Sequence, residues 1–195
     1  MYRIYLAAVD IVPAAVVLIP IFGVLYGCAN YYDLRKSVLY CLFCMYLSAV
    51  LSLVGIPNVT YLRPEVNLNL IPVVGIIEDM KNSILNVLLF LPLGLFLPLL
   101  WQSFRNLRAI ALFGFGLSLT VELLQMLTFR TTDVNDLITN TVGCMVGFLL
   151  TKPLTSRFPA VEKRSNEVYL LCILSFGVMF FLHPFLSPLI WDRIL

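Results

Sequence analysis

Long apolar runs, separated by short polar or proline-containing links, dominate the pattern of this chain. Six runs approach the roughly 20 mostly apolar residues that an α-helix needs to cross a membrane. Asp10 interrupts the first run, and Pro184 and Pro188 stand at the end of the last. The pattern therefore predicts an all-α, polytopic integral membrane helix bundle with about six transmembrane helices. Their expected bounds are 5–28, 37–56, 84–101, 109–128, 134–151 and 168–183.

The composition agrees with this pattern. The 195 residues are 61% hydrophobic and 12% charged, with a mean hydropathy of +0.95, whereas soluble domains are roughly 25% charged. The formal net charge is only +2, and no Lys/Arg cluster alternates with aromatics, which argues against nucleic acid as a partner. The sequence contains no P-loop, no HExxH motif, no Ser-His-Asp set and no Cys/His spacing typical of a metal site.

The link between the second and third runs, residues 57–83, contains the stretch VNLNLIPVVGIIEDMKNS. It is apolar enough to touch a membrane, but Asn and Pro break it too often for it to cross one. We therefore expect a surface or re-entrant segment. No stretch is long and polar enough to form a separate soluble domain, so residues 1–195 are expected to form a single membrane domain.

The basic residues suggest an orientation, because Lys and Arg in short loops stay on the cytoplasmic side. With six spans, the richer side is predicted to be cytoplasmic, which places both termini and the 57–83 link outside the cell membrane. The richer side carries Arg35, Lys36, Arg105, Arg108, Lys152, Arg157, Lys163 and Arg164, and the other carries Arg3, Arg63, Lys81, Arg130 and Arg193.

Polar residues gather where the fifth run begins, in the stretch FRTTDVNDLITNTVGCMVGF. Asp133, Asp136, Asn140, Gly143 and Gly147 step by three, four, three and four positions, so they share one face of a helix. The two glycines form a GxxxG pattern, which lets a neighbouring helix approach closely. This face is therefore expected to contact protein rather than lipid.

Successive spans run in opposite directions, so the start of the third, the end of the fourth and the start of the fifth share one membrane face. Glu122 is an intramembrane carboxylate, which costs several kcal/mol unless it is paired or lines a polar cavity. Arg130 is the nearest cation in the sequence and its expected partner. Polar residues expected to converge at this face are Asn86, Glu122, Gln125, Arg130, Asp133, Asp136, Asn140, the 67–72 link and, from the first span, Asp10.

Structural roles compete with functional ones for the same residues. Asp133 fits the N-cap of the fifth helix, and Asp136 would then lie in the favourable positive field of the first turn. Asn86 and Asn140 are also suited to bridging helices by hydrogen bonds, worth about 0.6 kcal/mol each.

Three stretches together resemble the VanZ-like family of small membrane proteins: NLIPV, NVLLFLPLGLFLPLL and SLTVELLQMLTFRTTDVNDLITNTVGCMVGFLL. The family pattern is an Asn before an apolar PLG, then E-x-x-Q, R-x-x-D-x-x-D and N-T-x-G. The resemblance covers residues 67–150, and the flanking spans share only its hydropathy. It implies a link to low-level resistance to the glycopeptide teicoplanin. The resemblance also implies that ten residues of this chain match positions that recur in the family: Asn86, Pro92, Gly94, Glu122, Gln125, Arg130, Asp133, Asp136, Asn140 and Gly143.

Three functions are compatible with these residues. The first is an outward-facing polar notch that binds or translocates an amphiphilic cell-envelope ligand: a lipid-linked wall intermediate, a polyprenyl phosphate or a lipoglycopeptide. Arg130 would bind an anionic head group, because guanidinium matches phosphate or carboxylate in a bidentate way. The ligand-binding residues would be Asn86, Gln125, Arg130, Asp133, Asp136 and Asn140.

The second function is an intramembrane enzyme acting on a phospholipid or glycolipid, with Glu122 and Asp136 as catalytic residues. Glu122 would act as general acid or base, while Asp133 and Asp136 would hold Mg²⁺. The third is a polar clamp that fixes the helices, with function through a membrane-protein partner or a homo-oligomer. Membrane lipids are expected partners in each case, and the sequence identifies no cofactor.

Overall fold

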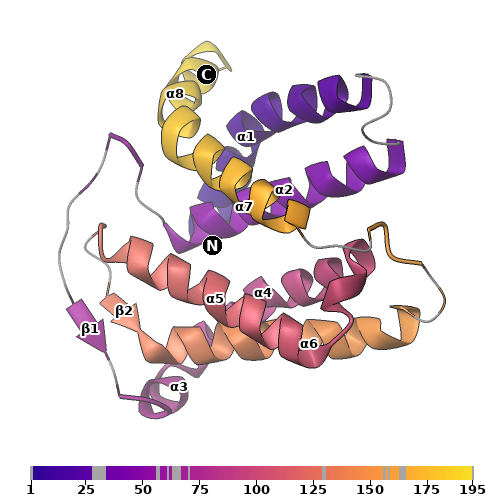
Figure 1. The fold of residues 1–195 in the computed structure, drawn as a ribbon. Helices are drawn as coiled ribbons and strands as arrows, with labels where there is room; N and C mark the ends of the chain where they lie inside the picture. Colours follow the sequence, from indigo (N-terminus) through magenta and orange to yellow (C-terminus); the bar gives the residue numbers. More distant parts are fainter. Residues whose placement is uncertain are drawn as a thin grey trace. The chain divides into compact units, whose positions relative to one another are not determined.

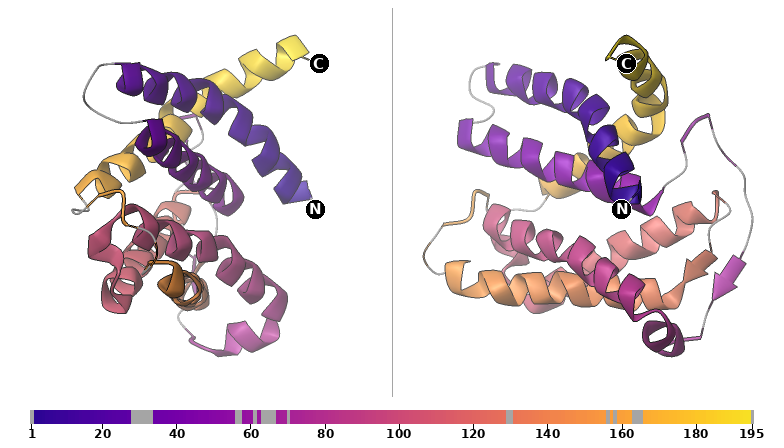
Figure 2. Two further views of the ribbon diagram at one scale, coloured as in Figure 1. Left: turned by 90° about the vertical axis from the view of Figure 1, so that its right-hand side faces the viewer. Right: turned by 180° about the vertical axis from the view of Figure 1, so that it is seen from behind.

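A computed structural model describes residues 2–27, 34–55, 58–60, 62, 67–69, 71–128, 131–155, 157, 159–162 and 166–194. The chain divides into two compact units (Figures 1 and 2). Unit 1 comprises residues 1–62 and 166–195, and unit 2 comprises residues 63–165. The expectation of a single membrane domain stays a prediction.

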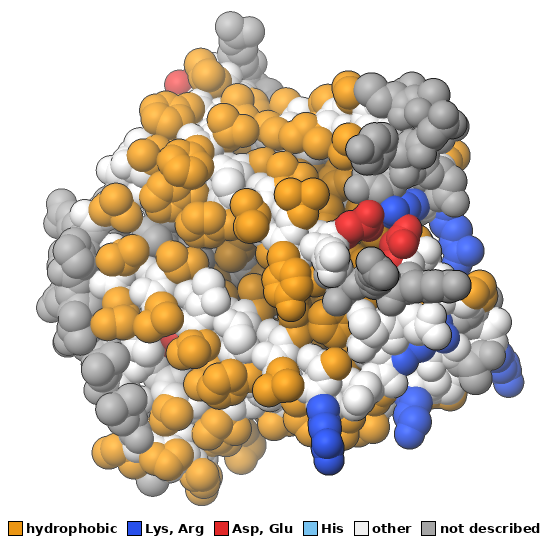
Figure 3. Space-filling view, in the orientation of Figure 1, with side chains coloured by type: hydrophobic (Ala, Val, Ile, Leu, Met, Phe, Trp, Pro, Cys, Tyr) orange, Lys and Arg blue, Asp and Glu red, His pale blue; other side chains and the backbone are white. Residues whose placement is uncertain are grey.

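Within the described residues, five helices are long and apolar enough to cross a membrane, and a sixth apolar stretch, Val9–Leu25, is shorter. On the face drawn in Figure 3, hydrophobic side chains cover broad areas, as expected of surfaces that meet lipid. The prediction of an all-α, polytopic membrane helix bundle is confirmed.

Unit 1 consists of α1 (Tyr2–Gly27), α2 (Leu34–Val54), α7 (Asn166–Gly177), the π-turn η2 (Val178–Leu182) and α8 (His183–Ile194). Helix α2 packs against both α1 and α7. The core between these helices is apolar and includes Leu18, Phe22, Tyr40, Phe43, Leu47, Val168 and Leu171.

The last helical run extends further than the sequence pattern predicts. Instead of ending near residue 183, it continues through α8 to Ile194. Pro184 lies directly after the π-turn and has no backbone N–H to donate to the Phe180 carbonyl oxygen four positions earlier. That oxygen accepts a hydrogen bond from the Val59 N–H instead, at 3.1 Å.

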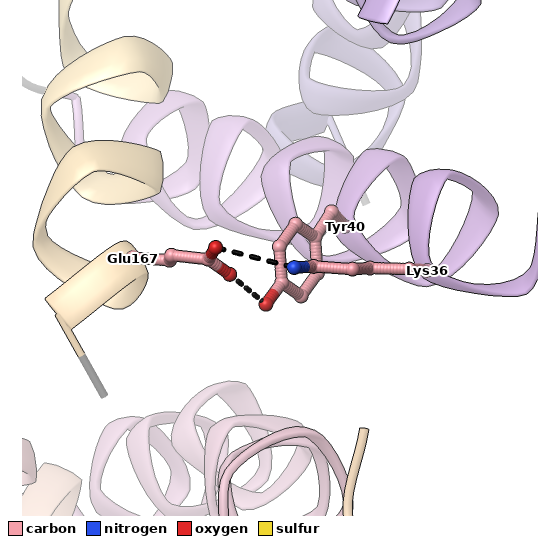
Figure 4. A network of polar contacts seen from close by, with 3 residues as sticks. All are labelled: Lys36, Tyr40 and Glu167. Carbon is pink, nitrogen blue, oxygen red and sulfur yellow. Dashed lines mark hydrogen bonds and ion pairs between the residues drawn. The ribbon is translucent and has the colours of Figure 1, made fainter. Parts of the chain in front are cut away.

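Polar contacts centred on two carboxylates, Glu167 and Asp10, join the helices of unit 1. Lys36 Nζ lies 3.2 Å from the Glu167 carboxylate, and the Tyr40 hydroxyl donates to the same carboxylate, so α2 is tied to α7 (Figure 4). Asp10 of α1 accepts from the Ser52 hydroxyl of α2 at 2.6 Å. His183 Nε2 lies 3.1 Å from the other oxygen of Asp10.

Unit 2 is built from three long helices, α4 (Met80–Leu100), α5 (Leu107–Gln125) and α6 (Val134–Thr155). The single turn of α3 (Val74–Glu78) precedes α4, and the 3-10 turn η1 (Gln102–Phe104) follows it. Helix α6 packs most extensively against α4 and also contacts α5. The unit is therefore an up-and-down arrangement in which α4 and α6 run in the same direction.

Glycines bring α4 and α6 together backbone to backbone. A Cβ added at Gly143 would collide with the carbonyl oxygen of Val87, and one added at Gly147 would collide with that of Leu91. On α4, a Cβ at Gly94 would collide with the Cys144 carbonyl oxygen. The prediction that the GxxxG face contacts protein is confirmed.

Two three-residue strands pair beside the start of α6. β1 (Asn67–Asn69) and β2 (Thr131–Asp133) run parallel, with Asn69 opposite Asp133. Figure 1 shows this pair next to the beginning of α6, with α3 nearby. The link before α4 is thus fastened to unit 2 by strand pairing.

The opposite end of unit 2 is basic. Arg105, after η1, donates to the carbonyl oxygens of Pro98 and Thr155 at 3.2 and 2.8 Å. Arg108, Lys152 and Arg157 belong to the same end, because they lie at the start of α5 and the end of α6. Glu122 and Asp133 lie at the other end of unit 2, near the end of α5 and the start of α6. These basic residues and these acidic residues are therefore at opposite ends of the unit, as the pattern predicts.

Candidate functional site

Asp133 holds the start of α6 and the end of β1. Its Oδ1 accepts from the backbone N–H of Asn135 at 2.8 Å, which is the N-cap bond that satisfies an otherwise unpaired donor of the first turn. Its Oδ2 accepts from Asn69 Nδ2 at 3.0 Å. The predicted N-cap is confirmed, and the same carboxylate also ties the 67–72 link to the helix.

Asn135 is a central residue that the sequence analysis did not select. Its side chain is 3% exposed, and its Nδ2 donates to Asp133 Oδ1 and to the Ile71 carbonyl oxygen at 2.7 and 3.0 Å. Its Oδ1 accepts from the Val73 N–H at 2.7 Å. The sequence analysis selected residues that are three or four positions apart and hence share a helix face. It missed Asn135 because this residue lies two positions from Asp133 and one from Asp136.

Glu122 lies near the end of α5 and is 3% exposed. Its Oε2 accepts from the backbone N–H of Asp133 at 3.0 Å, and its carbonyl oxygen accepts from the Thr132 hydroxyl at 3.0 Å. Gln125, one turn later, is also buried. The structure therefore brings α5 to β2 through Glu122, as the convergence of these segments predicts.

Asp136 forms the more exposed part of the site. Its Oδ1 accepts from Asn86 Nδ2 of α4 at 2.7 Å, and Asn82 Nδ2 lies 3.5 Å from the same oxygen. Asp136 and Asn86 are half-buried, whereas Asn82 is exposed. This pair links α4 to α6 and reaches the surface of unit 2.

Asn140 lies one turn deeper in α6. Its Nδ2 donates to the Ser118 hydroxyl of α5 at 2.9 Å, which confirms the predicted role as a bridge between helices. Its Oδ1 is buried with no hydrogen-bond partner among the described residues. Ser118 was not selected from the sequence, although it lies four positions before Glu122 and hence on the same face of α5.

We call the residues brought together here the polar cluster: Asn69, Asn86, Ser118, Glu122, Asp133, Asn135, Asp136 and Asn140. Arg130 lies outside the described residues, so its pairing with Glu122 stays a prediction. Asp10 belongs to unit 1, and its expected place beside the cluster stays a prediction as well.

The cluster is rich in carboxylate and amide groups, which suit hydrogen bonding to hydroxyl, amine or ammonium groups. Both oxygens of Asp133 already accept hydrogen bonds from this chain. Among the described residues, no group of three His, Cys, Asp or Glu side chains is arranged to hold a metal ion. In the described part of the cluster, the carboxylates of Glu122, Asp133 and Asp136 each accept hydrogen bonds from this chain.

Apolar helices of membrane-crossing length, with a cluster of ionisable and amide side chains at one end of a three-helix unit, define a multi-pass membrane protein with a polar cluster among its helices. A family model described as VanZ/LLP1 matches residues 34–156, which is more than half of the chain. The protein belongs to the VanZ-like family. This match includes all of the polar cluster.

Protein VanZ of Enterococcus faecium is 37% identical to this chain over 87 residues. The match covers 43% of this chain and 52% of that protein, so the chain spans about half the length of the curated relative it matches. None of the solved structures matches the chain.

Proposed function

We propose that the polar cluster binds or translocates an amphiphilic ligand of the cell envelope, at the outer face of the cell membrane. The observation that carries the proposal is the convergence of Asn86, Glu122 and Asp136 from three different helices at one end of unit 2. Ionisable groups among apolar helices are costly, and they commonly mark sites where a polar group is bound or transferred.

Asp136 is the best candidate for direct ligand contact. Its carboxylate is half-buried and reaches the surface beside the exposed Asn82, whereas Glu122 and Asn135 are buried and hold backbone groups. A lipid-linked wall intermediate or a lipoglycopeptide offers hydroxyl and amide groups that match these acceptors and donors. A polyprenyl phosphate would depend instead on the cation Arg130.

The structural alternative has specific support too. The described hydrogen bonds of Asp133 and Asn135 all have structural partners within this chain. They cap α6, hold β1 and hold the link before α3. Under this alternative the whole cluster fixes the helices, and the protein works through a membrane-protein partner or a second copy of itself. Ligand binding requires the negative charge of Asp136, whereas the structural alternative requires only its shape and its hydrogen bond from Asn86.

Asp136→Asn separates them, because an amide keeps the shape and still accepts from Asn86 while removing the charge. The experiment compares teicoplanin susceptibility of a Gram-positive host that makes wild type, Asp136→Asn or Asp192→Asn at equal membrane abundance. Asp192 is exposed in α8 of unit 1, so its variant is a matched carboxylate-to-amide control. We expect protection by wild type and the control but not by Asp136→Asn.

Equal protection by all three would favour the structural alternative. If no form protects, lipids that co-purify with each variant are identified by mass spectrometry. The proposal then requires a lipid that wild type and Asp192→Asn retain and that Asp136→Asn loses. Loss of a charge-assisted hydrogen bond, worth about 1.5–3 kcal/mol, corresponds to roughly tenfold or more weaker binding.

A further inference from the structure

The segment that joins β1 to α4 presents large apolar side chains outward. Ile71, Val73, Ile77 and Met80 each expose between 56% and 68% of their surface. They come from the turn before α3, from α3 itself and from the first position of α4. Four such side chains within ten residues form a patch that, in soluble proteins, marks contact with another molecule or a membrane.

The backbone of this segment is held in an unusual conformation at Val73. Val73 has a φ of 72°, a left-handed conformation that is strained for a β-branched residue. Such strain costs about 1–3 kcal/mol and persists only where the surroundings enforce it. Here Asn135 enforces it, because its amide binds both the Val73 N–H and the Ile71 carbonyl oxygen.

The other side of the same segment is closely packed. Gly75 lies against the Asn135 side chain, where an added Cβ would stand 2.7 Å from Nδ2. The Ser83 hydroxyl donates to the Ile76 carbonyl oxygen at 3.4 Å and to that of Asp79 at 3.1 Å. The segment is therefore packed against the rest of unit 2 through Gly75 and Ser83, while its large apolar side chains and Asp79 are exposed.

The exposed side continues directly into a membrane span. Ile84, Leu85 and Leu88 on α4 are exposed, and α4 is long and apolar enough to cross the membrane. Met80 lies one turn before Ile84 on the same face of the helix, so this apolar face of the span reaches the first residue of α4, with the exposed polar residues Asp79, Lys81 and Asn82 beside it. The surface that faces lipid along α4 thus extends into the segment.

We propose that residues 71–80 form a wedge that inserts into the bilayer, with lipid acyl chains against Ile77 and Met80. The exposed Asp79, Lys81 and Asn82 then lie at the level of the lipid head groups, where Asp79 caps α4 and the Lys81 ammonium, on its long stem, is favourable. Asn82 lies 3.5 Å from Asp136, so head groups at this level are beside the polar cluster. If the polar cluster binds a ligand, as proposed above, that ligand would enter laterally from the bilayer at this level. The contact of residues 71–80 with lipid does not depend on the proposed function.

Photocrosslinking of the full-length chain tests the wedge. p-Benzoylphenylalanine replaces Ile77 in one variant and Ile71 in a second, and each protein is reconstituted in vesicles of phosphatidylcholine and phosphatidylglycerol. Position 88 on the exposed face of α4 is the lipid-facing reference, and position 106, in the link between α4 and α5, is the reference outside the spans. After irradiation, intact mass spectrometry detects any covalent lipid.

We expect the variants at positions 71, 77 and 88 to gain the mass of one phospholipid, and the variant at position 106 to gain none. Lipid adducts at position 88 without any at 71 and 77 would overturn the wedge. A covalent dimer formed through position 77 would also overturn it, because a second copy of the chain would then cover the surface. None of these outcomes depends on Asp136, so they are separate from the susceptibility experiment.

Discussion

The two units hold their helices together in different ways. In unit 2, α4 and α6 meet at Gly143 and Gly147, where an added Cβ has no room. In unit 1, an added Cβ at Gly23 or Gly177 would have nothing within 4 Å. The helices there pack around an apolar core and are also joined by polar pairs such as Lys36 with Glu167.

This difference explains why polar residues have different consequences in the two units. Helices in a membrane gain little from the hydrophobic effect on association, so close packing at small residues and interhelical hydrogen bonds supply the attraction. Shape sets the spacing of α4 and α6, and that spacing brings Asn86 to Asp136. In unit 1 the described polar pairs join helices that pack around an apolar core, as Lys36 and Glu167 do for α2 and α7.

The largest expected effect is at the glycine contact. Gly147→Ala should destabilise the protein by at least about 1–3 kcal/mol, the usual cost of overpacking, because the new methyl meets the backbone of α4. Gly177→Ala is the matched control and should be neutral or stabilising, since Ala has the higher helix propensity. Denaturant unfolding in detergent, followed by circular dichroism, measures both. Equal losses of stability for Gly147→Ala and Gly177→Ala would contradict the conclusion that glycines mediate close helix packing in unit 2 but not at Gly177 in unit 1.

A smaller effect is expected at the helix caps. Asp133→Ala removes an N-cap, which costs about 0.5–2 kcal/mol, and also the bond to Asn69. Asp79 caps α4 through the Asn82 N–H at 3.1 Å, and its side chain has no other described role, so Asp79→Ala serves as the control. The same unfolding measurement should show a greater loss for Asp133→Ala. A greater loss for Asp79→Ala would mean that Asp133 does not fasten β1.

The smallest expected effect is at the ion pair of unit 1. A double-mutant cycle between Lys36→Ala and Glu167→Ala should give a coupling of about 1 kcal/mol, the upper end for exposed pairs, because Lys36 is largely buried beside Tyr40. A cycle between Arg35→Ala and Glu167→Ala is the control and should give a coupling near zero, since Arg35 is exposed. Equal coupling in both cycles would indicate a general charge effect rather than a specific tie between α2 and α7.

The helices could be predicted from the sequence because membrane-crossing length and apolarity are local properties. Val134 was expected to begin a helix and does begin α6. The continuation through Pro184 could not be predicted, because the π-turn before it leaves no simple hydrophobic period. The β1–β2 pair also could not be predicted, since three-residue strands carry too little pattern and their partner lies far along the chain.

The polar cluster was partly predictable for a related reason. Helix periodicity and opposite helix directions were sufficient to bring Asn86, Glu122 and Asp136 to one end of unit 2. They could not identify Asn135, whose partners are the backbone groups of Ile71 and Val73. Such a contact depends on the path of an irregular link, which no periodicity specifies.

The β1–β2 pair also has a consequence for biosynthesis. Asn69 and Asp133 are 64 positions apart, which corresponds to roughly 3–13 s of synthesis at about 5–20 residues per second. During this interval β1 leaves the ribosome without its partner strand, while α4 and α5 are being made. The polar cluster therefore cannot assemble until the start of α6 has been made, and a nascent chain that stalls before residue 131 carries α4 and α5 but neither α6 nor the complete cluster.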